Sequence, residues 1–178
     1  MTIWDALYSR IVPWATPPLI GTLLAAGIAL WLVLFRLGRS LGNVPDAKFT
    51  YTPDDVHAMF SAYGATGRRR YMRNAVTLDL LFPCIYASVL TLILVRLASQ
   101  LASPPATLRL LSFTPLFAGT CDLLENPCLV TLAWVYPLRQ DWLARVASSF
   151  TRLKWMLVAA SVLLVIVELF ARAVSILG

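Results

Sequence analysis

The stretch Phe113–Leu129, FTPLFAGTCDLLENPCL, places Asp122, Glu125 and Asn126 in the middle of a run of apolar residues. A carboxylate near the centre of a membrane helix costs about 2.5 to 3.5 kcal/mol on insertion scales, so acids in such segments face protein, water or a ligand. The three polar residues stand at i, i+3 and i+4, which puts them on one face of a helix. We therefore expect this stretch to face the inside of a membrane bundle, with Pro127 disturbing the helix just beyond the acids.

The composition of the whole chain is that of a polytopic membrane protein. Of its 178 residues, 59% are hydrophobic and 13% are charged, whereas a soluble domain carries about 25% charged residues. So few charges cannot cover a water-soluble surface. The net charge of +6 comes largely from Lys and Arg beside the apolar segments, where they set topology and meet anionic headgroups. We predict membrane lipids as partners and no binding of nucleic acid.

Four apolar segments are each long enough to cross a bilayer, because about 20 apolar residues span its hydrocarbon core. They predict an all-α bundle of four transmembrane helices that forms a single membrane domain over residues 1–178. The expected spans are about 17–36, 74–98, 108–136 and 153–174.

The polar segment 37–73 is expected to be a loop that contains a short amphipathic helix. Thr52 and Pro53 form a helix-start signal, since Thr caps helices and Pro suits the first helical position. Gly64 and Gly67 are expected to end this helix.

Basic residues gather in the two long connections, which predicts that these connections are cytoplasmic. Eleven of the fifteen lie there: Arg36, Arg39, Lys48, Arg68, Arg69, Arg70, Arg73, Arg139, Arg145, Arg152 and Lys154. Both termini and the short turn at Ser103–Pro105 would then lie on the non-cytoplasmic side. The four arginines directly before the second span are predicted to bind lipid headgroups: Arg68, Arg69, Arg70 and Arg73.

Two further acids, Asp79 in the second span and Glu168 in the fourth, complete the candidate site. At about 1.5 Å per residue from the cytoplasmic edge, Asp122, Glu125 and Glu168 reach similar depth, with Asp79 shallower. Together with Asn126 they are the predicted ligand-binding residues of a pocket between the second, third and fourth spans. Close carboxylates cannot all ionise cheaply, so we expect at least one of them to hold a proton near neutral pH.

Several functions are compatible with this constellation. The leading interpretation is the binding of a lipid, sterol, pigment or other amphiphile, or of a membrane-protein partner. The alternatives are a membrane-embedded lipid-modifying enzyme with Asp122 and Glu125 as catalytic acid and base, and a proton-coupled carrier. Polar contacts that only join helices would need no ligand. The pattern points to no metal site and to no particular cofactor.

Three motifs have the spacing of a known family: YGATGRRRYMRN at 63–74, LDLLFPCIY at 78–86 and CDLLENPCL at 121–129. They resemble a family of uncharacterised bacterial four-span membrane proteins, a likeness that implies the bacterial inner membrane and supplies no activity. Asp122 with Pro127, and Asp79 with Pro83, are similar to the acids beside proline-broken helices in the sterol-isomerase and sigma-2-receptor group. This second likeness is an architectural analogy.

Overall fold

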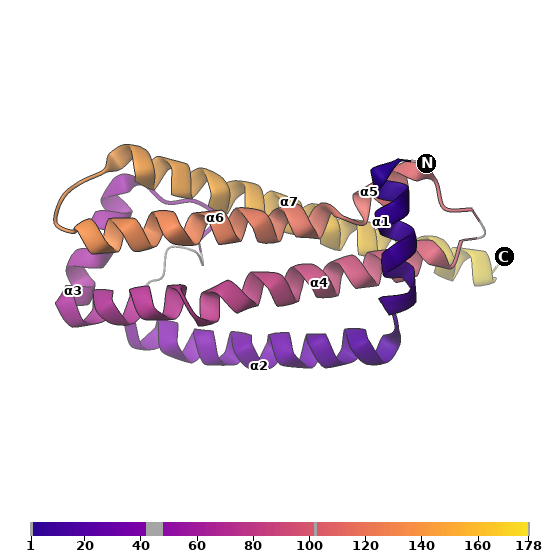
Figure 1. The fold of residues 1–178 in the computed structure, drawn as a ribbon, viewed down its shortest axis with the longest axis horizontal. Coiled ribbons are helices and arrows are strands. Elements are labelled where there is room, and N and C mark those ends of the chain that lie inside the picture. Colours follow the sequence, from indigo (N-terminus) through magenta and orange to yellow (C-terminus); the bar gives the residue numbers. More distant parts are fainter. Residues whose placement is uncertain (1, 42–47, 102, 178) are drawn as a thin grey trace.

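The computed structural model describes residues 2–41, 48–101 and 103–177, and every regular element within them is a helix (Figure 1). The elements are α1 (Ile3–Ile11), the 3-10 turn η1 (Val12–Trp14), α2 (Pro17–Leu41), α3 (Pro53–Ala75), α4 (Leu78–Ser99), α5 (Ala106–Leu111), α6 (Thr114–Val135) and α7 (Asp141–Leu177). Helices α2, α4, α6 and α7 run alongside one another. Helix α3 lies at one end of this bundle, and α1 and α5 lie at the other, as Figure 1 shows.

Three segments of the described chain are long and apolar enough to cross a membrane, by length and composition: Pro17–Arg39, Pro53–Ser99 and Asp141–Val174. The prediction of an all-α chain with helices of membrane type is therefore confirmed. Helix α6 is not one of the three, because its polar residues, Asp122, Glu125 and Asn126 among them, lower its apolar character.

Helix α3 begins as the sequence predicts, is interrupted at Gly64 and then continues to Ala75. The hydroxyl of Thr52 accepts a hydrogen bond from the backbone N–H of Asp55, and the Asp55 carboxylate accepts one from the backbone N–H of Thr52. This capping box satisfies two backbone groups that the first helical turn leaves open. Gly64, with φ 60° and ψ −177°, has a non-helical backbone and ends the first helical segment of α3, as the sequence predicts, whereas Gly67 lies within the second segment.

The other boundaries also differ from the expected spans. Thr77 has a non-helical backbone, so α4 begins at Leu78 rather than at Asn74. The expected third span is divided into α5 and α6. Helix α7 begins at Asp141, so a segment that we predicted to be a polar connection forms about three turns of helix. Lys154 therefore lies well inside α7.

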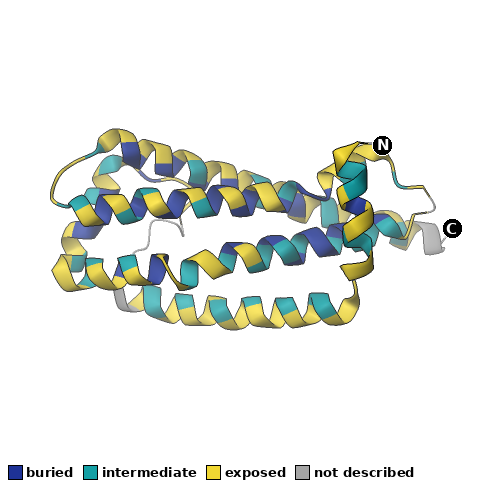
Figure 2. Cartoon of the chain, viewed as in Figure 1, coloured by how far each residue is buried: buried dark blue, intermediate teal, exposed yellow. Residues whose placement is uncertain are grey.

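Buried apolar side chains gather at both ends of the bundle. One group, which includes Phe60 and Leu129, joins α3 to α6 and α7. The other, which includes Tyr8, Val95 and Phe113, joins α1 to α4 and to the start of α6. Helix α6 packs on α3, α4 and α7, and both α6 and α4 have many buried residues. Helix α2, in contrast, packs mainly on α4 and has no buried residue over 17–39 (Figure 2).

Helices α4 and α6 approach each other closely at Gly119. A Cβ atom at this position would lie 2.9 Å from the Cβ of Ala87 and 3.2 Å from the carbonyl oxygen of Pro83. Both distances are shorter than ordinary van der Waals contacts. Glycine at this position therefore lets the backbones of the two helices come together, as small residues do between membrane helices.

Candidate functional site

An ion-pair cluster between α6 and α7 forms the centre of the candidate site. The Nζ of Lys154 lies 3.0 Å from Oδ1 of Asp122 and 2.9 Å from Oε2 of Glu125. Asp122 and Glu125 are about one turn apart on α6, so a single ammonium group reaches both. The Lys154 side chain is 7% exposed and that of Glu125 is fully buried. The positive charge thus lies beside carboxylates that would otherwise be costly to bury.

The sequence pattern did not reveal Lys154 as part of the site, because the residue follows a polar segment and looks like a topology signal. Once α7 is known to begin at Asp141, Ser148, Thr151 and Lys154 fall at spacings of three residues on one buried face. The helical spacing of these three polar residues is the sequence feature that could have identified Lys154 as part of the site.

Glu125 is held by hydrogen bonds on both of its oxygens. Its Oε1 accepts hydrogen bonds from the hydroxyl of Thr151 at 2.5 Å and from that of Tyr51 at 3.1 Å, while Oε2 faces Lys154. Tyr51 lies just before α3 and Thr151 lies on α7. Glu125 therefore joins three parts of the chain.

Asp122, in contrast, has an environment that is open on one side. Its Oδ2 accepts a hydrogen bond from the hydroxyl of Tyr86 on α4 at 3.2 Å. Asp122, Tyr86 and Lys154 all line a cavity, and Glu125 does not. Only one of the two candidate catalytic acids therefore faces a space that a ligand can enter, so they cannot both touch the same reacting group there.

The cavity itself has a volume of about 780 Å³ and lies between α2, α4, α6 and α7. Its walls are mainly apolar and aromatic, with contributions from three helices: Leu24, Ile28, Trp31, Ile85, Val89 and Val158. Polar side chains line the part toward α3: Asp79, Tyr86, Asp122, Asn126 and Lys154. This is the general form of a small-molecule site, in which apolar walls hold the ligand and a few polar groups orient it.

Asn126 and Asp79 are brought together through the backbone. The side-chain amide of Asn126 donates a hydrogen bond to the carbonyl oxygen of Asp79 at 3.2 Å. Pro83 stands four residues after Asp79 and has no N–H, so it cannot supply the helical hydrogen bond that this carbonyl would receive. Asn126 supplies that hydrogen bond and so stabilises α4 where proline interrupts it.

Glu168 lies far from the cluster, and the prediction of a shared depth is wrong. It follows Lys154 by fourteen residues on the same helix, which is about 21 Å along the axis. We expected the fourth span to begin at 153, which placed Lys154 at the membrane edge and Glu168 at the depth of Asp122 and Glu125. Because α7 begins at Asp141, it is Lys154 that lies beside these two acids. The nearby Arg172 donates a hydrogen bond to the carbonyl oxygen of Leu97, at the α1 end of the bundle.

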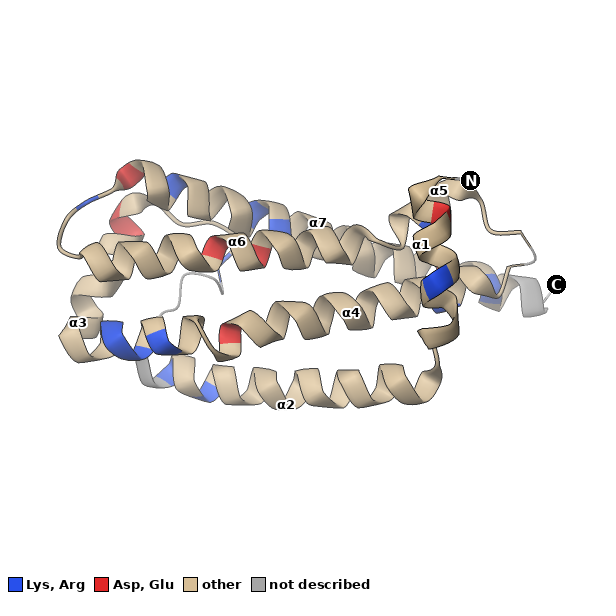
Figure 3. Ribbon diagram, in the orientation of Figure 1, with Lys and Arg blue, Asp and Glu red and all other residues tan. Residues whose placement is uncertain are grey.

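The four arginines predicted to bind headgroups differ in their surroundings. Arg68 donates a hydrogen bond to the carbonyl oxygen of Phe60 at 2.9 Å, across the bend at Gly64, and its guanidinium lies 4.2 Å from the centre of the Tyr136 ring. It serves the packing of α3. The other three, Arg69, Arg70 and Arg73, are exposed. In the ribbon of Figure 3, the basic positions of α3 and of the end of α2 lie at the same end of the bundle.

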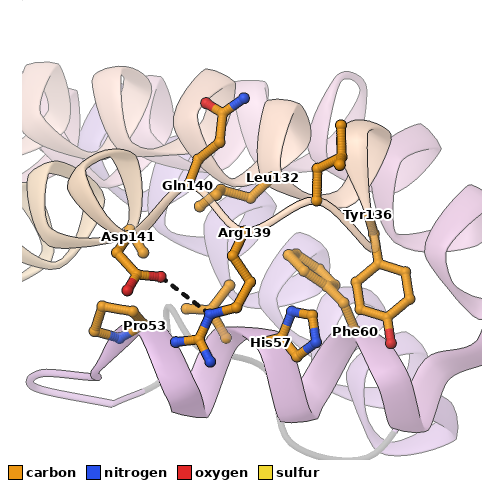
Figure 4. Close-up of a pocket in the computed structure, with 11 residues that line it drawn as sticks. Pro53, His57, Phe60, Leu132, Tyr136, Arg139, Gln140 and Asp141 are labelled. Atoms are coloured by element: carbon orange, nitrogen blue, oxygen red, sulfur yellow. Dashed lines mark hydrogen bonds and ion pairs between the residues drawn. The ribbon is translucent and has the colours of Figure 1, made fainter.

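A second, much smaller depression lies where α3 meets the connection before α7 (Figure 4). Its volume is about 20 Å³, which suits a single water molecule. Arg139 forms ion pairs with Asp54 at 2.5 Å and with Asp141 at 3.2 Å beside it. The ring of His57 lies 4.9 Å from that of Tyr136. These contacts fasten α3 to the end of the bundle, and the depression is too small for an organic ligand.

Over residues 2–41, 48–101 and 103–177, no three His, Cys, Asp or Glu side chains gather as metal ligands do. Comparison with known proteins assigns no family to the chain: no protein-family model matches it, and no curated protein or solved structure matches it significantly. The resemblance of Tyr63–Leu129 to bacterial four-span proteins therefore stays a prediction.

Proposed function

We propose that this protein is a four-span integral membrane protein that binds a lipid-like, amphiphilic ligand in the cavity beside Asp122 and Lys154. The observation that carries the proposal is the cavity of about 780 Å³, whose walls are apolar and whose polar groups are concentrated toward α3. A ligand with a long apolar chain and a polar head matches this arrangement, with its chain against the apolar walls and its head among the polar groups.

The fourth span in this proposal is α6. Its 22 residues extend about 33 Å, enough for a hydrocarbon core of about 30 Å. It packs between α4 and α7, which belong to two of the candidate membrane segments. Its two acids are bonded to Lys154, so the main cost of placing them in hydrocarbon is offset inside the protein.

The end that carries α3 is assigned to the cytoplasm. Without Lys154 and Arg68, which are engaged inside the bundle, nine basic residues remain at that end, against four at the other. Such an excess marks the cytoplasmic side. In a cysteine-free background, Cys introduced at Ser61 should react with a membrane-impermeant maleimide only from the cytoplasmic side, and Cys at Ser103 only from the other. The reverse pattern contradicts the assignment.

The dimensions of the cavity suit a lipid chain. Along α2, its lining extends from Leu24 to Arg39, which is about 22 Å. Half of a hydrocarbon core of about 30 Å is about 15 Å. An acyl chain that lies in one leaflet can therefore be accommodated over its whole length.

Photolabelling in bilayer nanodiscs tests the proposal. The probe is a long-chain alcohol with a diazirine in its chain, and the protein is the full chain in phosphatidylcholine nanodiscs. We expect saturable labelling of peptides from α2 and α4, which the same alcohol without the diazirine competes away. Val158→Trp, which fills the cavity, should abolish the saturable part.

The matched control is Leu163→Trp, because Leu163 also lies on α7 and is 60% exposed. It adds the same side chain outside the cavity and should leave the labelling unchanged. Labelling that rises in proportion to the probe, without saturation, or that Val158→Trp does not alter, overturns the proposed function.

A further inference from the structure

We infer that the head of this ligand is anionic and that Arg39 and Lys48 bind it at the α3 end of the cavity. The inference rests on the proposed function and adds the chemical class of the ligand. It comes from the two cations that line the cavity besides Lys154.

The first of these cations is positioned by an aromatic ring of the cavity wall. Arg39 stands in the last turn of α2, and its guanidinium carbon lies 5.8 Å from the centre of the Phe35 ring. Phe35 also lines the cavity. A guanidinium that stacks on a ring keeps its N–H groups at its edge available, and their fork geometry matches the oxygens of a phosphate, sulfate or carboxylate.

Arg39 lies farther out along the cavity than Asp79. Gly27 on α2 faces Ile85 on α4, with 3.2 Å between a Cβ built at Gly27 and the Ile85 side chain. Along α2, Arg39 follows Gly27 by twelve residues, which is about 18 Å. Along α4, Asp79 precedes Ile85 by six residues, which is about 9 Å. Because the two helices are antiparallel, both residues lie in the same direction from the contact between Gly27 and Ile85. An anionic head at Arg39 and Lys48 therefore leaves the chain directed toward the apolar wall.

The charges deeper in the cavity do not favour a cationic head. Asp122 is already bonded to Lys154 at 3.0 Å and to Tyr86 at 3.2 Å. Asp79, the other acid of the lining, is outnumbered by Arg39 and Lys48. Further exposed arginines stand at the same end of the bundle: Arg36, Arg69, Arg70 and Arg73. The field at this end therefore attracts anions.

The test compares three photoreactive probes with the same tail and different heads: alkyl sulfate, alkyl trimethylammonium and alcohol. In phosphatidylcholine nanodiscs the sulfate should saturate the cavity at the lowest concentration. Arg39→Gln/Lys48→Gln should raise the half-saturating concentration of the sulfate about thirtyfold, on the order of fivefold for each cation removed. The alcohol should bind this variant as it binds the original protein, which shows that the cavity is intact.

Arg36→Gln/Arg69→Gln is the matched control, because it removes two exposed charges from the same end without touching the lining. It should change sulfate binding by less than about twofold, through the general field alone. Inorganic sulfate should not displace the alkyl sulfate, because it lacks the tail that concentrates the probe in the bilayer.

The possible failures are distinguishable. If the alcohol shows no saturable labelling, the proposed function itself falls. If the alcohol saturates but the ammonium probe binds as well as the sulfate, the anionic head is refuted and amphiphile binding stands. The same holds if Arg39→Gln/Lys48→Gln has no effect or if the control variant loses binding equally. Displacement of the alkyl sulfate by inorganic sulfate also overturns the inference, because the two cations would then bind a free anion rather than the head of an amphiphile.

Discussion

Lys154→Met should destabilise the bundle by about 3 to 5 kcal/mol, because it leaves two buried carboxylates without their cation. In the structure the ammonium lies 3.0 Å from Asp122 and 2.9 Å from Glu125. At an effective dielectric constant of 20, each contact is worth about 5.5 kcal/mol before desolvation is subtracted. Desolvation offsets much of that attraction in the intact protein. When the lysine is lost, the carboxylates are still desolvated and no cation offsets the cost.

The assay is reversible unfolding in mixed micelles, with increasing sodium dodecyl sulfate and helicity followed by circular dichroism. Adding Glu125→Gln to Lys154→Met should restore about 1 to 3 kcal/mol, because the amide oxygen can still accept hydrogen bonds from Tyr51 and Thr151 without a charge. Arg145→Met, at an exposed site on the same helix, serves as the control. A loss within about 1 kcal/mol for Lys154→Met, as an exposed ion pair would give, or no rescue by the second substitution, refutes the reasoning.

Three further predictions concern the ends and contacts of the helices. Gly119→Ala should destabilise the protein by about 1 to 3 kcal/mol in the same unfolding assay, since its Cβ overlaps α4. Gly64→Ala should cost about 1 to 3 kcal/mol, because φ 60° with ψ −177° is a backbone conformation reserved for glycine. The pKa of Asp5 is lowered from 3.8 to about 2 by the backbone hydrogen bond from Thr2 and by Arg109, so its stabilisation of α1 should be present above pH 3.8 and lost as the pH falls toward 2.

Two of these predictions have a control within the chain. Gly21→Ala should stabilise the protein slightly, because a Cβ there meets no neighbour and alanine favours helix; a similar gain for Gly119→Ala contradicts the close contact. For the acid transition, the fluorescence of Trp4, with the other tryptophans replaced, reports whether α1 stays packed on Phe113. Asp5→Asn should remove the change between pH 3.8 and 2, and a transition that persists in this variant must come from another group.

The all-helical fold could be predicted because it depends on apolar length and on local signals. Runs of about 20 apolar residues specify membrane-type helices whatever surrounds them, and the Thr52 capping box needs only residues that are close in sequence. The second helical segment of α3, after Gly64, and the start of α7 at Asp141 depend on packing against other helices. Tertiary contacts of that kind do not appear in a local pattern.

The candidate site was predicted in part, for a similar reason. Asp122, Glu125 and Asn126 were identifiable because polar residues at one helical spacing in an apolar run must face a partner. The identity of that partner depends on which residue of α7 lies at the same height, and this height follows from where α7 begins. Lys154 was therefore assigned to a connection, and Glu168 was assigned to a pocket that it does not reach.

Helix α2 packs mainly on α4 and has no buried residue over 17–39. This loosely packed helix forms one wall of the cavity, which affects how the cavity can discriminate between lipids. A ligand that reaches the cavity from the bilayer leaves one hydrocarbon environment for another, so its tail gains almost no hydrophobic free energy by binding. The cavity then discriminates only weakly between tails of different length. The concentration that determines how far the cavity is occupied is the mole fraction of the ligand in the membrane. Discrimination between one lipid and its neighbours rests on the few polar groups that meet its head.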